Sequence, residues 1–165
     1  RWGGRLDLTL PLDSVGVSNA ILKFNSTLQD SRVNDPLTGE ARMFTGRLNH
    51  DWYVEFRQDV PELQIAWGGD YYSRGPSRSW RLNEIRTNDF SEGDFDLFIE
   101  TTRYFGGALL RFGVDNIFEA YDELDRQFYQ VSADPFATPR TVPTRLEQRV
   151  EASGREYSLT IAGSF

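Results

Sequence analysis

Apolar and polar residues alternate with a period of two along most of this chain, and this alternation predicts strands. In residues 155–165, Tyr157, Leu159 and Ile161 share one face with Phe165, while the intervening positions are small, polar or charged. No segment has the 3.6-residue period of an amphipathic helix. The predicted strands cover residues 5–10, 20–28, 43–57, 63–72, 80–104, 109–118 and 155–165. The chain is therefore predicted to be all-β, with about seven strands.

The connections between these strands differ in length. Short turns are predicted at 13–16, 58–62 and 105–107, and longer loops at 30–42 and 134–154, with a loop tip at 73–77. All seven prolines fall at predicted turns or strand ends, where no ladder N–H is lost. The short turns share one side if residues 80–104 form a single long strand. This layout is typical of an antiparallel up-and-down transmembrane β-barrel.

Composition narrows the class of protein further. The net charge is −7, from 25 acidic and 18 basic residues, which argues against a nucleic acid as partner. The chain has no cysteine, so disulfides and cysteine-based metal sites are excluded. A mean hydropathy of −0.52 excludes a transmembrane helix. It leaves a transmembrane barrel open, because each barrel strand is only half apolar.

The apolar faces of the predicted strands have two interpretations. Trp52, Trp67, Phe95, Phe112 and Tyr157 fit a lipid-facing band with aromatic girdles. The same faces could instead form the core of a soluble antiparallel β module.

The opposite faces carry charges at regular positions, which suits a water-filled lumen. These charges could belong to a solvated wall that makes no specific contact, or some of them could bind a partner inside the lumen. The candidates are Arg5, Asp7, Lys23, Glu55, Arg57, Glu100, Arg111 and Asp115, with Asp70 and Asp96 on the same faces.

No residue pattern predicts catalysis or a cofactor. His50 is the single histidine, and no motif marks a nucleophilic serine for it. The acids at 94–96 and 122–125 lack EF-hand spacing, so they are interpreted as solvated loop acids. We expect neither an enzyme nor a resident metal.

Two segments near the C-terminus carry a resemblance to a known family. Residues 114–121 read Val-Asp-Asn-Ile-Phe-Glu-Ala-Tyr, and residues 154–157 read Gly-Arg-Glu-Tyr ahead of Phe165. This resembles the end of TonB-dependent outer-membrane receptors, which close with v-N-L-F-(D/E)-x-x-Y, a loop, and G-R-x-y-x-l-x-l-x-x-x-F. The departures are isoleucine for leucine at 117, an extra aspartate at 115, and Gly163 where a bulky apolar residue is usual. The resemblance covers residues 109–165.

The resemblance implies an outer-membrane barrel of 22 strands, of which residues 1–165 supply the last seven. It implies a plug domain and a TonB box outside this chain, and Tyr157 and Phe165 as the terminal signal for barrel assembly. The implied function is active transport of a large scarce nutrient, such as a ferric siderophore, cobalamin or a glycan. Expected partners are outer-membrane lipid, the rest of the barrel, the plug, TonB through the plug, and a surface or periplasmic protein. Another outer-membrane barrel, such as a porin or an enzyme, is the alternative, as is a soluble β module.

Overall fold

The computed structural model describes residues 1–91, 93–130 and 142–163 of the chain. Within these ranges no helix is long and apolar enough to cross a membrane. The strands are β1 (Trp2–Pro11), β2 (Ala20–Asp30), β3 (Val33–Asn34), β4 (Ala41–Arg42), β5 (His50–Val60), β6 (Ile65–Arg74), β7 (Ser77–Trp80), β8 (Glu84–Phe90), β9 (Asp94–Thr101), β10 (Leu109–Asp115), β11 (Tyr121–Phe128), β12 (Arg145–Ala152) and β13 (Glu156–Ala162). Three single-turn 3-10 helices are η1 (Asp13–Val15), η2 (Pro61–Leu63) and η3 (Phe105–Gly107).

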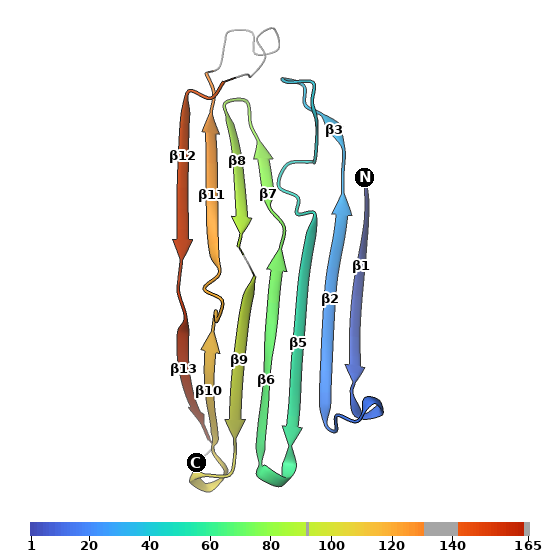
Figure 1. The fold of residues 1–165 in the computed structure, drawn as a ribbon, viewed down its shortest axis with the longest axis vertical. Helices are drawn as coiled ribbons and strands as arrows, with labels where there is room; N and C mark the ends of the chain where they lie inside the picture. Colours follow the sequence, from blue (N-terminus) through green and yellow to red (C-terminus); the bar gives the residue numbers. More distant parts are fainter. Residues whose placement is uncertain (92, 131–141, 164–165) are drawn as a thin grey trace.

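Seven of these strands form one antiparallel sheet in the order β1-β2-β5-β6-β9-β10-β13. Each pairs with its neighbour in the up-and-down sense, and the strand pairs β1–β2, β5–β6 and β9–β10 are joined at one end through the three 3-10 turns (Figure 1). The prediction of an all-β, antiparallel chain is confirmed, although the described residues contain further strands beside the seven of this sheet. The turns predicted at 13–16 and 105–107 are confirmed as well.

A second, four-stranded sheet in the order β12-β11-β8-β7 continues four of these strands beyond the seven-stranded sheet (Figure 1). Only residues 75–76, 91–93, 116–120 and 153–155 separate the paired halves. The predicted long strand at 80–104 corresponds to β8 and β9, which run in line with a break at 91–93.

The loop tip predicted at 73–77 is wrong. β6 continues to Arg74, and the chain resumes the same direction as β7 before it reverses at residues 81–83. Gly75 donates its backbone N–H to the carbonyl of His50 at 3.0 Å, and Pro76 has no N–H to donate. The Gly-Pro pair therefore interrupts the ladder within a strand instead of turning the chain.

Three further boundaries differ from the predictions. The long loop predicted at 134–154 contains β12, although residues 131–141 lie outside the described part. The acids at 122–125, interpreted as loop residues, belong to β11. β5 begins at His50 and not at residue 43, and it ends at Val60, so the turn predicted at 58–62 falls on η2.

The seven-stranded sheet has two different faces. Its apolar face carries a row of paired residues that crosses all seven strands: Leu10, Leu22, Phe56, Gly69, Leu97, Val114 and Tyr157. Its charged face carries the row Lys23, Glu55, Asp70 and Asp96. This is the alternation predicted from the sequence.

Protein does not cover the apolar face within the described residues. Among all described residues, the buried hydrophobic side chains are three alanines, Ala20, Ala66 and Ala120. Trp52 and Trp67 are more than two-fifths exposed, and Leu159 and Ile161 about two-thirds. A soluble sandwich would bury these side chains in its core, so this single layer of sheet has no core of its own.

The sheet is open at both sides. β1 pairs only with β2, and β13 pairs only with β10, among the described residues. The predicted closure into a barrel is therefore not made by this chain, and two rows of backbone N–H and C=O groups remain available for pairing.

Gly69 should be required for the close pairing within the apolar row. A Cβ added there would collide with the carbonyl oxygen of Asp96 and lie 2.6 Å from the Cδ2 atom of Leu97. We expect Gly69→Ala to lower the free energy of unfolding by about 1–3 kcal/mol, measured by urea titration of the folded protein. Gly4→Ala is the matched control, because nothing lies within 4 Å of the added atom in β1. Equal stability of the two variants would contradict this account.

Candidate functional site

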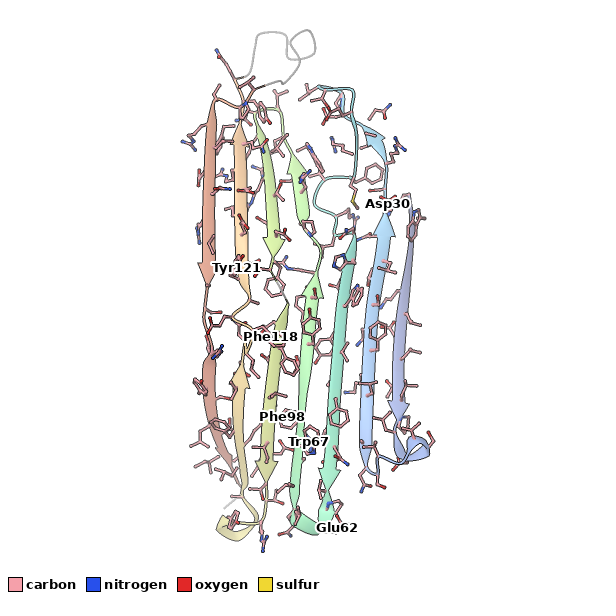
Figure 2. The ribbon with its side chains drawn as sticks, viewed as in Figure 1. Asp30, Glu62, Trp67, Phe98, Phe118 and Tyr121 are labelled. Atoms are coloured by element: carbon pink, nitrogen blue, oxygen red, sulfur yellow. The ribbon has the colours of Figure 1, made fainter. Side chains whose placement is uncertain are left out.

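Three of the candidate residues meet around Phe98 on the charged face of the seven-stranded sheet. Glu100 accepts a hydrogen bond from Arg57 at 2.6 Å and lies 3.6 Å from Arg111. The guanidinium of Arg111 lies 3.9 Å from the centre of the Phe98 ring, and that of Arg57 lies 5.7 Å from it. Arg57 also pairs with Asp59 at 2.9 Å. The result is a neutral, half-buried cluster on the lower half of β9, where Figure 2 labels Phe98.

The remaining charged candidates form two separate pairs and one isolated position. Arg5 pairs with Asp7 in β1 at 2.9 Å, and both side chains are largely exposed. Lys23 pairs with Glu55 across β2 and β5 at 2.9 Å. These groups share the charged face, as predicted. Asp115 faces Glu156 across β10 and β13 and joins none of the other candidates in an ion pair.

The terminal-signal residues are only partly described. Tyr157 pairs with Val114 on the apolar face and is 69% exposed. Phe165 lies outside the described residues.

The segment that carries the family resemblance includes a compact, hydrogen-bonded turn between β10 and β11. Asn116 is only 7% exposed and has a left-handed backbone with φ of 55°. Its Nδ2 donates to the carbonyl oxygens of Ala120 and Gly154 at 3.1 and 3.0 Å, and its Oδ1 accepts from the backbone N–H of Ala120 at 2.7 Å. Its own N–H donates to Asp96 at 2.8 Å. The strand pairing is interrupted at residues 116–120 and 153–155. The buried amide of Asn116 hydrogen-bonds backbone groups of both segments in place of the missing bonds between strands.

Arg155 ties the same two interruptions together from outside. Its Nε donates to the carbonyl of Ile117 at 2.9 Å, and its guanidinium pairs with Glu119 at 3.2 Å. Phe118 stacks on Phe95 with ring centres 5.2 Å apart. The asparagine, phenylalanine and arginine of the resemblance thus act together at one junction of the two sheets, where Figure 2 labels Phe118.

The charged face continues onto the four-stranded sheet. Arg74 donates to Asp122 of β11 at 2.6 Å, and its guanidinium lies 5.3 Å from the ring of Phe90. Tyr72 contacts the same ring, with centres 5.9 Å apart. These contacts join the two sheets on one face.

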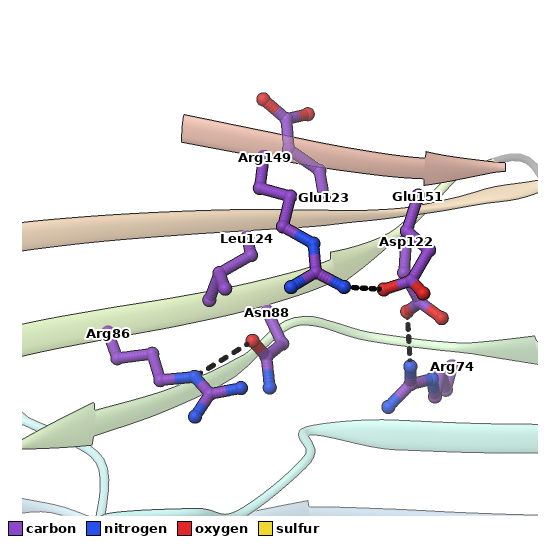
Figure 3. A pocket seen from close by; sticks show the side chains of 8 residues that line it. All are labelled: Arg74, Arg86, Asn88, Asp122, Glu123, Leu124, Arg149 and Glu151. Carbon is purple, nitrogen blue, oxygen red and sulfur yellow. Dashed lines mark hydrogen bonds and ion pairs between the residues drawn. The ribbon is translucent and has the colours of Figure 1, made fainter. Parts of the chain in front are cut away.

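A polar cavity of about 250 Å³ lies at this junction (Figure 3). It contains three guanidinium groups and the carboxylates of Asp122 and Glu151, so it offers hydrogen-bond donors and acceptors to a polar solute. Arg149 and Glu151 pair across its upper side at 2.6 Å, and Arg86 donates to Asn88 at 3.2 Å. Its lining residues are Arg74, Arg86, Asn88, Asp122, Glu123, Leu124, Arg149 and Glu151.

A second charged cluster fixes the far end of the four-stranded sheet. Glu84 is buried and accepts a hydrogen bond from Arg126 at 2.6 Å. Arg126 also lies 3.4 Å from Glu147 of β12, so this guanidinium links β8, β11 and β12. The hydrogen bond from Arg126 and its positive charge outweigh burial and lower the pKa of Glu84.

Sequence reasoning missed several of these residues. Phe98 was visible only as an apolar residue that breaks the alternation of the charged face, and that break was its signal. Asp122 gave no signal, because β11 is polar on both faces and so lacks the alternation that marks a strand. Arg74 and Arg149 fell within the predicted loop tip at 73–77 and the predicted loop at 134–154. The role of Asn116 could be recognised only once the structure had placed residues 116–120 beside residues 153–155.

No group of three or more histidine, cysteine, aspartate or glutamate side chains in the described part of the chain could hold a metal ion. Neither a family model, nor a curated protein, nor a solved structure matches this chain.

Asn116 should be essential to the junction of the sheets. Asn116→Ala leaves the two carbonyl oxygens and the N–H that it satisfies without their partner, so we expect a loss of about 3 kcal/mol in the free energy of unfolding. A urea titration measures this loss. Asn83→Ala, at the exposed tip between β7 and β8, should change little. A loss no greater than that of the control would refute the role assigned to Asn116.

The buried Glu84 should make the stability of the four-stranded sheet sensitive to acid. Its pKa is lowered below the ordinary value of 4.5, so its contribution to stability is present above that pH and is lost as the pH falls through the lowered value. We expect amide hydrogen exchange in β8 and β11, corrected for its intrinsic pH dependence, to accelerate over this range. Glu84→Gln should remove most of that dependence, whereas Glu62→Gln in the exposed turn η2 should retain it. An identical pH profile in all three proteins would disprove the assignment.

Proposed function

We propose that this chain is the C-terminal part of the barrel wall of a TonB-dependent outer-membrane receptor. Further strands pair with the two open sides of the sheet and complete a barrel of 22 strands around a plug domain. The receptor imports a large scarce nutrient, such as a ferric siderophore, cobalamin or a glycan, and TonB drives the import through the plug. Outer-membrane lipid covers the apolar face.

The observation that carries this proposal is the contrast between the two faces of the sheet. The apolar row extends across all seven strands without a protein partner among the described residues, and the charged face lies directly behind it. A wall that separates lipid from a wet lumen has this pattern, because lumen-facing and lipid-facing residues alternate along each strand.

The same observation argues against a soluble antiparallel β module. Such a module has to bury an apolar face of this size, and each leucine or phenylalanine left in water gives up about 1.5–3 kcal/mol of burial free energy. The buried alanines of the described residues provide none of that stabilisation.

The hydrogen-bonded turn around Asn116 supports the assignment to TonB-dependent receptors in particular. The residues that carry the resemblance are the residues that join β10 to β11 and β12 to β13. Their spacing in the sequence therefore has a structural reason here, which a chance match of eight residues would lack.

The charged face has two levels, and we assign them different roles. The cluster of Arg57, Glu100 and Arg111 lies near the short-turn end and faces the plug. The polar cavity around Arg74 and Asp122 lies on the outward extension, where an arriving solute first meets the wall. Both are half-buried groups whose charges are mostly matched, so a partner can exchange hydrogen bonds with them without leaving a buried charge unpaired.

The plug contact is tested in the full-length protein. Arg57→Gln combined with Arg111→Gln should slow TonB-dependent uptake by about tenfold, the equivalent of about 1.4 kcal/mol of lost coupling. Uptake of candidate nutrients is measured in cells with and without a proton ionophore. Arg32→Gln, an exposed arginine outside the seven-stranded sheet, is the control.

The outcome distinguishes the classes of barrel. Uptake that is insensitive to the ionophore in the wild-type protein would favour a porin and refute TonB dependence. A protein that stays in solution without detergent would refute the membrane assignment as a whole.

A further inference from the structure

Arg86 differs from the other two arginines that line the polar cavity of the four-stranded sheet. Those two are each held by a carboxylate at 2.6 Å, in the pairs Arg74–Asp122 and Arg149–Glu151. Arg86 donates from Nε to the Oδ1 atom of Asn88 at 3.2 Å, and within the described ranges no carboxylate lies within ion-pair distance of it. Its side chain is exposed, so its two terminal nitrogens are available to a ligand that enters the cavity (Figure 3).

The carboxylates near Arg86 are bound to other arginines. Glu84 lies two residues before it in β8, but Glu84 accepts a hydrogen bond from Arg126 at 2.6 Å. Arg126 is the register partner of Arg86 in β11, so two positive charges face each other across these strands. Together with Arg74, the strands of this sheet carry five arginines and four carboxylates on this face: Arg74, Arg86, Arg126, Arg145 and Arg149, and Glu84, Asp122, Glu147 and Glu151. The face has a surplus of one positive charge, and Arg86 carries it.

Glu123 adds no carboxylate to this side of the sheet, although it is one of the residues around the cavity. It lies between Asp122 and Leu124 in β11, and side chains alternate along a strand, so its carboxylate is directed to the opposite face. There it lines another cavity, of about 400 Å³, with Asp125 and Trp80. The surplus of one charge in the polar cavity is therefore not cancelled by Glu123.

A surplus of one charge favours a single carboxylate over a more highly charged anion. A phosphate monoester carries about −1.5 to −2 at neutral pH, and its second charge would meet the two carboxylates of the cavity without a cation of its own. Further along the same face of β6, Asp70 lies four residues before Arg74 and faces Glu55 in β5 and Asp96 in β9. This row of carboxylates repels an anion with several charges, such as citrate, as it moves along the wall.

The remaining groups of the cavity suit hydroxyl groups and a small apolar surface. Asn88 uses its side-chain oxygen for Arg86, so its NH2 group keeps its donors for a ligand. Asp122 and Glu151 each hold one guanidinium and retain lone pairs that accept from hydroxyl groups. Leu124 adds an apolar contact. The volume of about 250 Å³ is below the roughly 300 Å³ at which pockets for drug-sized ligands begin, so the cavity holds one unit of a larger solute.

We propose that the polar cavity binds a uronic acid unit of a glycan. Arg86 binds its carboxylate and Asn88 donates to its hydroxyl groups, which in turn donate to the carboxylates of the cavity. The planar guanidinium matches the two oxygens of a carboxylate, and such charge-assisted hydrogen bonds are about twice as strong as neutral ones. The inference rests on the proposed function in that it takes the charged face as the wall that a solute meets, and it narrows the transported nutrient to an acidic glycan.

The test measures binding to the full-length protein in detergent by saturation-transfer NMR titration at constant ionic strength. The probes are the methyl glycosides of glucuronic acid and galacturonic acid, each compared with its neutral hexoside. At least one acidic glycoside should bind the wild type about tenfold more tightly than its neutral counterpart. Arg86→Gln should abolish this preference without weakening the binding of the neutral glycoside. Arg86→Lys should retain part of it, because the charge remains while the planar fork is lost.

Arg78→Gln is the matched control, and its preference should equal that of the wild type. Arg78 is an exposed arginine of β7 next to Ser79, which is the register partner of Arg86, and its side chain lies on the opposite face of the same sheet. It therefore removes the same charge at the same level of the sheet without touching the polar cavity. A thermal unfolding scan of each variant checks that it is folded.

Three results would overturn the inference. One is equal binding of the acidic and neutral glycosides to the wild type, and another is an unchanged preference in Arg86→Gln. The third is tighter binding of inorganic phosphate or citrate than of either uronic acid glycoside, which would identify a general anion site. Failure of the proposed function is a separate result: uptake that is insensitive to the ionophore leaves this binding measurement intact. Ionophore-sensitive uptake without any preference for a uronic acid would refute the present inference alone.

Discussion

The apolar face of the seven-stranded sheet is the feature on which the rest of the structure depends. It crosses all seven strands, and the described residues provide no second layer to cover it. Full burial of large apolar side chains, which usually stabilises a domain of this length, is therefore absent among the described residues. The strand ladders supply order along the sheet, but stability has to come from whatever covers this face and pairs with β1 and β13.

The interruptions between the two sheets mark a change of environment along the strands. In the seven-stranded sheet the strands are apolar on one face. In the four-stranded sheet β11 carries charged residues on both faces, and β12 carries them on one. At the junction the ladder bonds are lost, and side chains replace them: Asn116 bonds to both neighbouring strand ends, and Arg155 closes the same gap. A junction held by side chains keeps the strands in line while it allows the register to change between sheets.

Prediction from the sequence succeeded for the seven-stranded sheet and largely failed for the four-stranded sheet. The seven-stranded sheet could be predicted from alternation, as in the Leu6, Leu8 and Leu10 series of β1, because one face is apolar and the other is polar. β12 was assigned to a loop because three prolines precede it and its charges are of both signs, although Leu146 and Val150 alternate with charged residues. β7 was hidden by Gly75 and Pro76, whose usual meaning is a turn. Whether the sheet closes depends on which strands pair with β1 and β13, and no local sequence pattern predicts that pairing.

The charges on the charged face of the seven-stranded sheet are not balanced evenly, and this constrains what can cover it. The cluster around Phe98 is neutral, with two arginines against Asp59 and Glu100. One step along the strands, Glu55, Asp70 and Asp96 face one another across three strands, and Lys23 pairs only with the first of them. Carboxylates so arranged repel one another, and the repulsion grows when water is removed. A domain that packs against this row therefore has to supply cations or hydrogen-bond donors, or leave water between the two surfaces.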